Sequence, residues 1–357
     1  MGALVTIIMP VYNTEKFLDK AIESIINQTF ENFDFIIIDN GSTDKSGDII
    51  NRWAKKDRRI KVIHNRENQL ISDARNRAIE LSDSKYICFA DSDDWIENEM
   101  LADMVEEAEK SDADLVIAGF YMEYYQQGKY SCYPVVSDQR NYSKDEFKKE
   151  AYKLLNKTML AVPWNKLFKL ENIRKYNIKY RNTKWEDHHF NMDYIMDCGN
   201  VSVIGKAYYH YYRSRPGSDS EIVYDRELYK KRKEHFMHTL EVYKHWSYWD
   251  SNTEKYLANY YSGRMLQCTQ EASCFKGLSV KERKNKIRDI LNDDLTVEQI
   301  EKAKPDNLMM AICLLPLKWR NVSLCYIEGV LISFVKTHFS NLFYQIRAKE
   351  AQGANRR

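Results

Sequence analysis

Three aspartates stand within four positions in the segment YICFADSDDWI, residues 86–96. Asp91, Asp93 and Asp94 follow an apolar run with the length and composition of a buried strand. Neighbouring carboxylates repel one another, so such a cluster needs a compensating cation. Mg²⁺ and Mn²⁺ prefer oxygen ligands and complete their shells with water and substrate phosphates. The spacing therefore indicates a divalent metal site, while capping of the helix expected over 97–110 is an equally common role for Asp93 or Asp94.

The aspartates belong to a part of the chain that alternates strand and helix signals. Short apolar runs predict the strands, and apolar residues at a spacing of three or four predict the helices. The expected strands are 4–12, 33–39, 60–65, 86–91 and 113–120, and the expected helices are 14–28, a segment through Ile49 and Trp53, 71–81 and 97–110. Thr14 is expected to cap the first helix. This order predicts an α/β fold whose mostly parallel sheet is covered on both faces.

Polar residues follow three of the expected strands, at 10–13, 39–44 and 91–94. In open α/β sheets, ligands bind outside the carboxyl ends of the strands, and parallel strands bring these ends to one edge. Loops are generally polar, which would explain polar residues after one strand but less easily after three strands. Neither GxGxxG nor GxxxxGK(S/T) occurs in the chain, so a nucleotide bound at this edge would need a metal ion for its diphosphate.

Composition narrows the function classes. The 357 residues are enough for two domains, 44% are hydrophobic, and the formal net charge is only +2. This balance argues against a nucleic-acid-binding protein. The seven cysteines are scattered, and no two have the CxxC spacing of a zinc or redox site. We therefore expect a reducing, cytoplasmic setting.

Five segments carry a resemblance to a known family. TIIMPVYN, IIIDNGSTD, ENQLISDARNRAIE, ICFADSDDW and WEDHHF stand in the order and spacing of the family 2, GT-A fold glycosyltransferases. The resemblance covers residues 3–220 and implies an inverting enzyme with a nucleotide-sugar donor, for which UDP is favoured. It implies transfer of a hexose or N-acetylhexosamine to a glycan or lipid-linked acceptor in the synthesis of a capsule, exopolysaccharide or related surface glycan.

The resemblance assigns nucleotide-binding roles to residues at the first two strand ends. Pro10, Tyr12 and Asn13 match positions where the first strand meets the nucleotide. Asp39 matches the acid that hydrogen-bonds the nucleobase, and Arg75 matches a basic residue near the nucleotide. Leu70 departs from the pattern, because the family usually has glycine there. The backbone at that position must therefore adopt a conformation that tolerates a Cβ atom.

The resemblance also implies a metal site and a general base. Asp91 matches an acid near the ribose or the metal, and Asp93 matches the acid that binds the Mn²⁺ or Mg²⁺ bridging the diphosphate. His210 is a candidate third metal ligand, with a structural, hydrogen-bonded histidine as the alternative. Asp187 matches the general base that deprotonates the acceptor hydroxyl for direct, inverting displacement. Glu186 beside it would raise the pKa of Asp187 by charge repulsion or cap the helix that begins there.

Two further segments are interpreted as flanking the site. PWNKLF, residues 163–168, resembles a segment lining the acceptor side, with the side chains of residues 164–166 exposed to that pocket. A packed tryptophan beside a surface lysine is the other interpretation of this segment. Arg213, Arg215 and Ser218 would close over the diphosphate as a lid, or form a solvated turn.

The end of the chain differs from the rest. Strand signals nearly vanish after residue 221, so we expect domains at 1–220, for nucleotide-sugar binding and catalysis, and at 221–357, which is helical. Residues 304–357 contain eight Lys or Arg and three Asp or Glu, a net charge of 8 − 3 = +5, between apolar clusters. This pattern fits a helix on the inner face of the cell membrane or one that packs on the core or on another copy of the chain.

Two rival functions are weighed against transfer. A sugar-nucleotide nucleotidyltransferase would need a Gly-rich, basic loop after the first strand, whereas the loop here is PVYNTEKF. A non-catalytic carbohydrate-binding protein on the same fold would be expected to lose the Asp91–Asp93 pair or Glu186–Asp187, and both are present.

Overall fold

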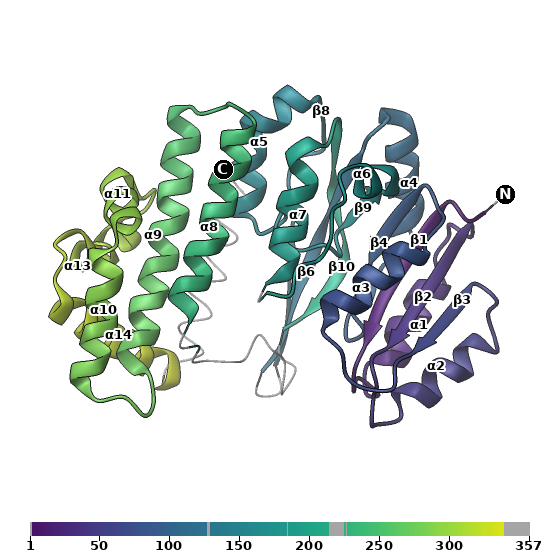
Figure 1. Cartoon of the computed structure of the whole chain (residues 1–357), viewed down its shortest axis with the longest axis horizontal. Helices are drawn as coiled ribbons and strands as arrows, with labels where there is room; N and C mark the ends of the chain where they lie inside the picture. The colour runs from purple at the N-terminus through teal and green to yellow at the C-terminus, as the bar shows by residue number, and fades with distance from the viewer. Residues whose placement is uncertain (1, 127–128, 184, 214–224, 226, 339–357) are drawn as a thin grey trace. The chain divides into compact units, whose positions relative to one another are not determined.

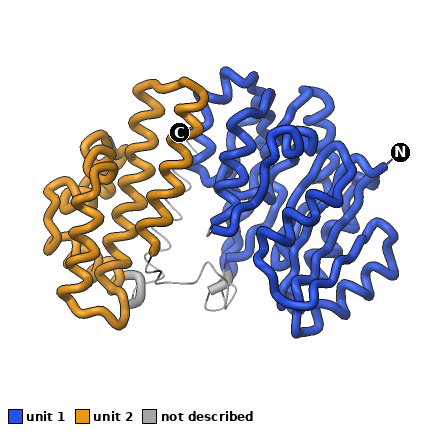
Figure 2. Tube along the Cα trace, viewed as in Figure 1, with its two compact units in different colours: residues 1–216 blue, residues 217–357 orange. Residues whose placement is uncertain are grey.

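The computed structural model describes residues 2–126, 129–183, 185–213, 225 and 227–338. The chain forms two compact units, Met1–Pro216 and Gly217–Arg357, which are coloured separately in Figure 2. The domain boundary expected at residue 220 lies outside the described residues. The first unit contains the sheet, and the described part of the second unit consists of helices and their connections.

A ten-stranded sheet forms the centre of the first unit (Figure 1). Its strands are β1 (Val5–Val11), β2 (Phe33–Asp39), β3 (Ile60–His64), β4 (Tyr86–Phe89), β5 (Trp95–Ile96), β6 (Leu115–Gln126), β7 (Lys129–Val135), β8 (Arg140–Tyr142), β9 (Lys166–Lys169) and β10 (Val201–Tyr212). The order is β3-β2-β1-β4-β9-β6-β10-β5, with β7 beside β6 and β8 beside β10. Because β9 is antiparallel to both β4 and β6, strands β3, β2, β1, β4, β6 and β10 all run the same way. The predicted α/β sheet is confirmed.

The carboxyl ends of β2, β1 and β4 meet at one edge of the sheet, because the three strands are parallel neighbours. Pro10 is buried in β1, one residue before its end. Proline cannot donate a ladder hydrogen bond, so it is rare in a central strand. The carbonyl of Ile8 accepts the last hydrogen bond between β1 and β4, from the amide of Ala90. Pro10 comes two residues later, so its nitrogen faces the same side of the strand, beyond the end of β4. The missing N–H therefore breaks no ladder bond.

Seven helices of the first unit are described. They are α1 (Leu18–Ile26), α2 (Ser46–Ala54), α3 (Ile71–Leu81), α4 (Met100–Ser111), α5 (Lys144–Asn156), α6 (Leu170–Lys175) and α7 (Glu186–Asp197). The expected helices over the first 120 residues are confirmed, although α1 begins four residues later than predicted. Thr14 does not cap it: the residue before α1 is Phe17, which makes no side-chain cap bond.

Thr14 instead joins the chain after β1 to the segments that follow β2 and β4. Its amide donates to Ser46 Oγ at 3.0 Å, at the first residue of α2. Its hydroxyl donates to Ser92 Oγ at 3.0 Å, in the loop after β4. Helix α4 likewise takes no cap from the aspartates, because its N-cap residue is Glu99, without a side-chain bond. The capping role considered for Asp93 and Asp94 is therefore wrong.

The middle of the chain contains a strand pair and a helix. Strands β6 and β7 pair antiparallel, so the strand expected over 113–120 continues as β6 to Gln126. Helix α5 was not predicted, although its start has a clear sequence signal. Ser143 accepts from the amide of Glu146, and the Glu146 carboxylate accepts from the amide of Ser143. This capping box satisfies two helix-end donors reciprocally.

The described part of the second unit is built from helices. They are α8 (Leu228–His245), α9 (Ser251–Cys274), α10 (Val280–Asn292), α11 (Asp294–Lys302), α12 (Leu308–Cys313), α13 (Leu315–Lys318) and α14 (Val322–His338). The longest of them is α9, with 24 residues. Helix α9 packs against α8, α10, α11 and α14, so it is the centre of this unit. None of the helices in the described residues is both long enough and apolar enough to cross a lipid bilayer.

Candidate active site

Arg75 on α3 lies at the centre of three carboxylates. Its side chain is 2% exposed. Nη1 donates to Asp187 Oδ1 at 2.5 Å and to Glu186 Oε1 at 3.1 Å, and Nη2 donates to Asp91 Oδ1 at 3.1 Å. The fold thus brings together residues that are 16 and 112 positions apart from Arg75. We call this group the arginine–carboxylate cluster.

The charges of the cluster shape its titration. Burial lowers the pKa of Arg75, but the charges of the surrounding carboxylates, Asp187 above all, raise it by a larger amount. The net pKa is therefore above its ordinary value, and the guanidinium stays charged. Burial raises the pKa of Asp187 to about 7, with the charges of Glu186 and Asp91 adding to the effect and Arg75 opposing it. Such a carboxyl exchanges its proton near neutral pH, as a general base requires.

The backbone before Asp187 adopts a strained conformation. Trp185 precedes α7 with φ +62° and ψ +42°, in the left-handed region. For a bulky residue this conformation costs on the order of 1–2 kcal/mol and persists only where the surroundings impose it. It sets Glu186 and Asp187 in the first turn of α7, with both carboxylates on Arg75. The Asp187 side chain remains 28% exposed.

The three aspartates after β4 have different surroundings. Asp94 is buried, and it accepts from the Tyr209 hydroxyl at 2.9 Å and from the Tyr212 amide at 2.8 Å. Burial raises its pKa, and the charges of Asp93 and Asp91 raise it further. Asp91 and Asp93 are partly exposed because burial alternates along this segment. These two carboxylates, which we call the acid rim, therefore face solvent, whereas Asp94 anchors the loop to β10.

The first two strand-end loops are tied together by hydrogen bonds. Asn13 has φ +52°, and its side-chain oxygen accepts from the Thr43 amide at 2.8 Å. Asp39 accepts from the Ser42 amide at 3.0 Å and contacts His64 Nδ1 at 2.9 Å. Tyr12 is exposed. Asp39 is therefore held in place at the edge where the nucleobase was expected.

The Leu70 position is resolved by its backbone. Leu70 precedes α3 with φ −65° and ψ +140°, an extended conformation open to any L-residue, and its side chain is exposed. The preceding loop is held by Asn40, whose Nδ2 donates to the Gln69 carbonyl at 2.5 Å. The side chain in place of the family's usual glycine therefore causes no strain.

His210 lies in a different group from the acid rim. Tyr209, which contacts Asp91 and Asp94, and His210 are adjacent on β10, so they point to opposite faces of the sheet. His210 Nδ1 contacts Glu123 Oε1 at 2.5 Å, and Nε2 contacts Glu97 Oε1 at 2.8 Å. The structure therefore does not join His210 to Asp91 and Asp93.

The segment expected to face the acceptor is buried. The exposed fractions of Trp164, Asn165 and Lys166 are 2%, 0% and 0%, so the prediction of exposed side chains is wrong. The Lys166 ammonium donates to the carbonyls of Met159 and Val162 and to Asn165 Oδ1, which uses all three donors. Burial holds the pKa of Lys166 well below its usual range, opposed by the charge of Asp187.

The expected lid falls mostly outside the described residues. Arg213 is described, and its amide donates to the Glu123 carbonyl at 3.0 Å while its guanidinium lies 5.7 Å from the Tyr211 ring centre. Arg215 and Ser218 lie outside the described residues. The lid therefore stays a prediction.

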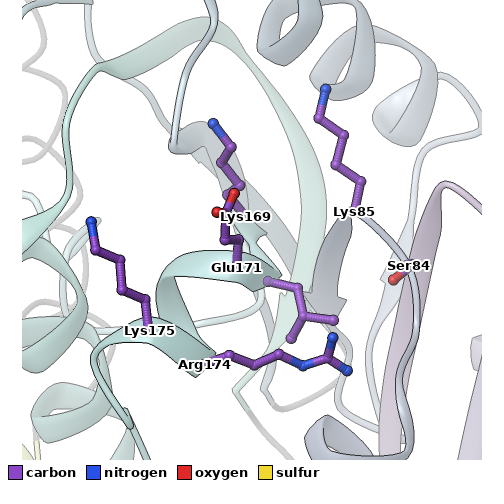
Figure 3. A pocket seen from close by; sticks show the side chains of 7 residues that line it. Ser84, Lys85, Lys169, Glu171, Arg174 and Lys175 are labelled. Atoms are coloured by element: carbon purple, nitrogen blue, oxygen red, sulfur yellow. The ribbon is translucent and has the colours of Figure 1, made fainter.

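A basic cavity of about 560 Å³ opens at the opposite edge of the sheet (Figure 3). Ser84 and Lys85 precede β4, and Lys169 ends β9, which is antiparallel to β4. The acid rim follows the other end of β4, so this cavity is separate from it. Two of its cations are already paired, since Lys85 contacts Glu109 at 2.7 Å and Lys169 contacts Asp114 at 3.1 Å.

Two features of the site were missed in the sequence. Tyr209 joins the Asp91 amide to the Asp94 carboxylate through its hydroxyl. The only sequence signal was its position in the aromatic run YYHYY of a strand. Arg75 was expected near the nucleotide, but its bonds to Asp91 and Asp187 depend on tertiary contacts that no local pattern shows.

Comparisons with known proteins agree with this architecture. A model of glycosyl transferase family 2 matches residues 6–176. The uncharacterized glycosyltransferase EpsJ of Bacillus subtilis (strain 168) is 30% identical over 330 residues, which cover 90% of this chain and 94% of EpsJ.

Solved structures share the fold at low sequence identity. S. aureus TarS 1–349 in complex with UDP-GlcNAc has a TM-score of 0.64 and 18% identity, covering 94% of this chain and 92% of that chain. The mannosyltransferase PcManGT from Pyrobaculum calidifontis, in complex with GDP-Man and Mn²⁺, has a TM-score of 0.51 and 12% identity, covering 93% and 87%. The extended match to EpsJ, together with the family model and the GT-A-like fold, shows that this chain belongs to the family 2 glycosyltransferases.

Proposed function

We propose that this chain is an inverting, metal-dependent glycosyltransferase that moves a hexose or N-acetylhexosamine from a UDP-sugar to a glycan or lipid-linked acceptor of a cell-surface polysaccharide. The observation that carries the proposal is the arginine–carboxylate cluster. Arg75 joins Asp91 of the acid rim, on the donor side, to Asp187, the candidate base. One buried guanidinium thus sets the positions of the two groups that an inverting transfer needs on opposite sides of the sugar.

The acid rim fits a hard divalent cation. Asp91 and Asp93 are partly exposed and offer carboxylate oxygens, which suit Mg²⁺ or Mn²⁺. When bound, the cation would offset the negative charge that grows on the departing diphosphate. Mannosyltransferase PcManGT, which shares the fold, was solved with Mn²⁺. Asp94 is excluded from this role because both of its oxygens are used by β10.

Asp187 takes the proton of the acceptor hydroxyl. Its Oδ1 is held by Arg75, and the exposed part of the carboxylate is open to the acceptor. A pKa of about 7 lets the group lose its proton near neutral pH and still bind the proton released during attack. Asp39, His64 and the loops tied through Asn13 would hold the nucleoside at the neighbouring strand ends.

The test is donor hydrolysis and transfer with a panel of nucleotide sugars, each with and without Mn²⁺. We expect metal-dependent turnover of a UDP-sugar, with inversion at the anomeric carbon detected by NMR. Asp93→Asn should abolish metal-dependent UDP binding in calorimetry, whereas Asp83→Asn, an exposed aspartate before β4, should leave it unchanged. Release of pyrophosphate from a sugar phosphate and a nucleoside triphosphate would identify a nucleotidyltransferase, and sugar binding without turnover would identify a carbohydrate-binding protein.

The second unit carries an apolar surface that suits a lipid-linked acceptor. Helices α12 to α14 expose large apolar side chains, at Leu308, Met309, Ile312, Trp319, Leu324, Ile327, Val330, Leu331, Phe334 and Val335. Lys318 and Arg320 are exposed between these helices, and 304–357 carries a net charge of 8 − 3 = +5. Apolar side chains beside cations favour an anionic lipid surface over another protein. We therefore place this surface on a membrane.

Vesicle flotation tests the membrane contact. The double variant Ile327→Glu, Leu331→Glu should lose flotation with vesicles that contain phosphatidylglycerol. Leu81→Glu, which changes an equally exposed leucine in the first unit, should float like the unchanged chain. Flotation of the double variant would overturn the contact, and so would a dimer that forms through these helices in place of lipid binding.

A further inference from the structure

Three neighbouring strands, β7, β6 and β10, gather metal-ligating side chains on one face of the sheet, away from the acid rim. Glu123 on β6 and Cys132 on β7 are directly opposite in the antiparallel register. His210 on β10 is opposite Tyr121, two residues before Glu123. Because side chains alternate along strands, Tyr121 and Glu123 share a face, and the register brings Cys132 and His210 to it. Ligand atoms of Glu123, Cys132 and His210 all lie within 4.8 Å of one another.

Glu123 is an unbalanced buried acid. Its exposed fraction is 0%, and Oε1 contacts His210 Nδ1. No hydrogen bond reaches its buried Oε2 from the residues that the structure describes. A buried carboxylate oxygen without a donor costs free energy that a bound cation would remove. The Glu123 carboxylate contacts the imidazole of this group through Oε1, and the orphaned Oε2 is an observation independent of the clustering itself.

The surroundings of His210 resemble those of a metal-binding histidine. Its ring is stacked between Trp95, with centroids 4.9 Å apart, and Tyr121, at 4.5 Å. Its Nε2 contacts Glu97 Oε1 at 2.8 Å. A carboxylate on one ring nitrogen fixes the tautomer and leaves the other nitrogen as the ligand, an arrangement typical of metal-binding histidines. The nitrogen left to bind an ion is then Nδ1, which contacts Oε1 of Glu123, the second proposed ligand.

We propose that Glu123, Cys132 and His210 form a second metal site, for Zn²⁺ or a similar borderline ion. A carboxylate, a thiolate and an imidazole are the ligand set of zinc, not of the hard cations that an all-oxygen rim selects. The ion replaces the proton between Nδ1 and Oε1 and the thiol proton, and both protons leave to solvent. Nδ1 and Oε1 then separate by about 1 Å to reach the spacing of two ligands of one ion.

Two neighbouring groups bear on the site. The Tyr130 hydroxyl borders it: burial raises the pKa of Tyr130, and so do Glu123 and Cys132, so the phenol keeps its proton and the fourth position is left to water. Lys20 is a nearby cation, with Nζ 3.0 Å from the Trp95 ring centre. Burial lowers its pKa and the charge of Glu123 opposes this, so Lys20 balances part of the carboxylate charge without bonding Oε2. Zinc would tie the β6–β7 hairpin to β10.

Cobalt substitution tests the site independently of the proposed function. The full chain is stripped with a chelator and titrated with Co²⁺ alone, because a sulfur-to-cobalt charge-transfer band in the near ultraviolet reports only a thiolate ligand. We expect this band to grow to one equivalent and to be displaced by Zn²⁺. Cys132→Ser should abolish it, and His210→Gln and Glu123→Gln should each lower the affinity for Co²⁺ by about 10- to 100-fold.

Matched variants separate this site from the rest of the chain. Cys274→Ser, on α9, removes a cysteine of similar exposure and should leave the band unchanged. Asp93→Asn removes one of the two carboxylates of the acid rim and should also leave the band unchanged. A band that is absent from the unchanged chain, or that survives Cys132→Ser, overturns the proposal. Circular dichroism of each variant shows whether the fold is retained, and a lowered Co²⁺ affinity in Glu123→Gln with a retained fold supports the proposal even where Cys132→Ser does not fold.

Discussion

Two groups of side chains in the first unit balance buried negative charge in different ways. In the arginine–carboxylate cluster, Arg75 contacts Asp91, Glu186 and Asp187, so the chain supplies its own cation. In the group of Glu123, Cys132 and His210, one carboxylate oxygen has no donor among the described residues. The first group keeps its carboxylates placed and partly open to substrate. The second calls for a cation from outside, and its ligand types differ from those of the acid rim. Position and ligand type thus distinguish the proposed zinc site from the proposed Mg²⁺ or Mn²⁺ site at the acid rim.

Removing Arg75 should cause the largest loss of stability, because the arginine–carboxylate cluster depends on this cation. Arg75→Met leaves three carboxylates facing one another, and we expect a loss of about 3–5 kcal/mol in the free energy of unfolding. Their pKa values rise in the variant, so its stability is highest at acid pH and is lost as pH increases through those values. Urea unfolding at several pH values measures this.

Arg77→Met provides the control for Arg75. Arg77 lies on the same helix, is exposed, and bonds Asn65 Oδ1 at 2.9 Å. It should change the unfolding free energy by less than about 0.5 kcal/mol. Equal losses in the two variants would show that the arginine–carboxylate cluster does not depend on its central charge.

Asp187→Asn should separate catalysis from binding. The asparagine can still accept from Arg75, but it cannot take a proton, so transfer should fall by about 10²- to 10⁴-fold while the Kd for UDP stays near that of the unchanged chain. Steady-state kinetics and calorimetry measure the two effects. Asp193→Asn on the same helix, where the carboxylate pairs with Arg181 at the surface, should retain transfer. Unchanged turnover in Asp187→Asn would remove Asp187 from the mechanism.

Zn²⁺ should stabilise the folded chain by binding the group of Glu123, Cys132 and His210, and not by binding the arginine–carboxylate cluster. At a free Zn²⁺ concentration 100 times its Kd, binding adds about 2.7 kcal/mol to the free energy of unfolding and raises Tm. The increase should vanish in Cys132→Ser and persist in Asp93→Asn. Differential scanning fluorimetry of the chelator-treated chain measures it. Loss of the increase in Asp93→Asn instead would assign the effect to the acid rim.

The smallest expected effect is the change of kcat/KM with pH. Because the pKa of Asp187 is raised to about 7 and the base must be ionised, kcat/KM should rise about tenfold per pH unit below 7 and level off above it. The residual activity of Asp187→Asn should not show this rise. A plateau that already begins near pH 5 would show that Asp187 titrates as an ordinary carboxyl in the free enzyme.

The sequence was sufficient where the physics is local. Apolar runs predicted β1, β2, β3, β4 and the start of β6, because a strand buried on both faces must be apolar throughout. Parallel order then placed the residues after β1, β2 and β4 at one edge. The capping box of α5 was equally local, so that helix could have been predicted from Ser143 and Glu146.

The tertiary structure decided which of these side chains meet. Arg75 was visible as a basic residue, but its contact with Asp187 joins positions 112 apart in the chain. His210 was grouped with the acid rim in the sequence, whereas its place on β10 turns it toward Glu123, because adjacent strand residues point to opposite faces. Burial of Lys166 likewise depends on carbonyls that only the fold assembles. Residue types and local periodicity thus settle which elements form, while strand register and long-range packing settle which charges lie within bonding distance.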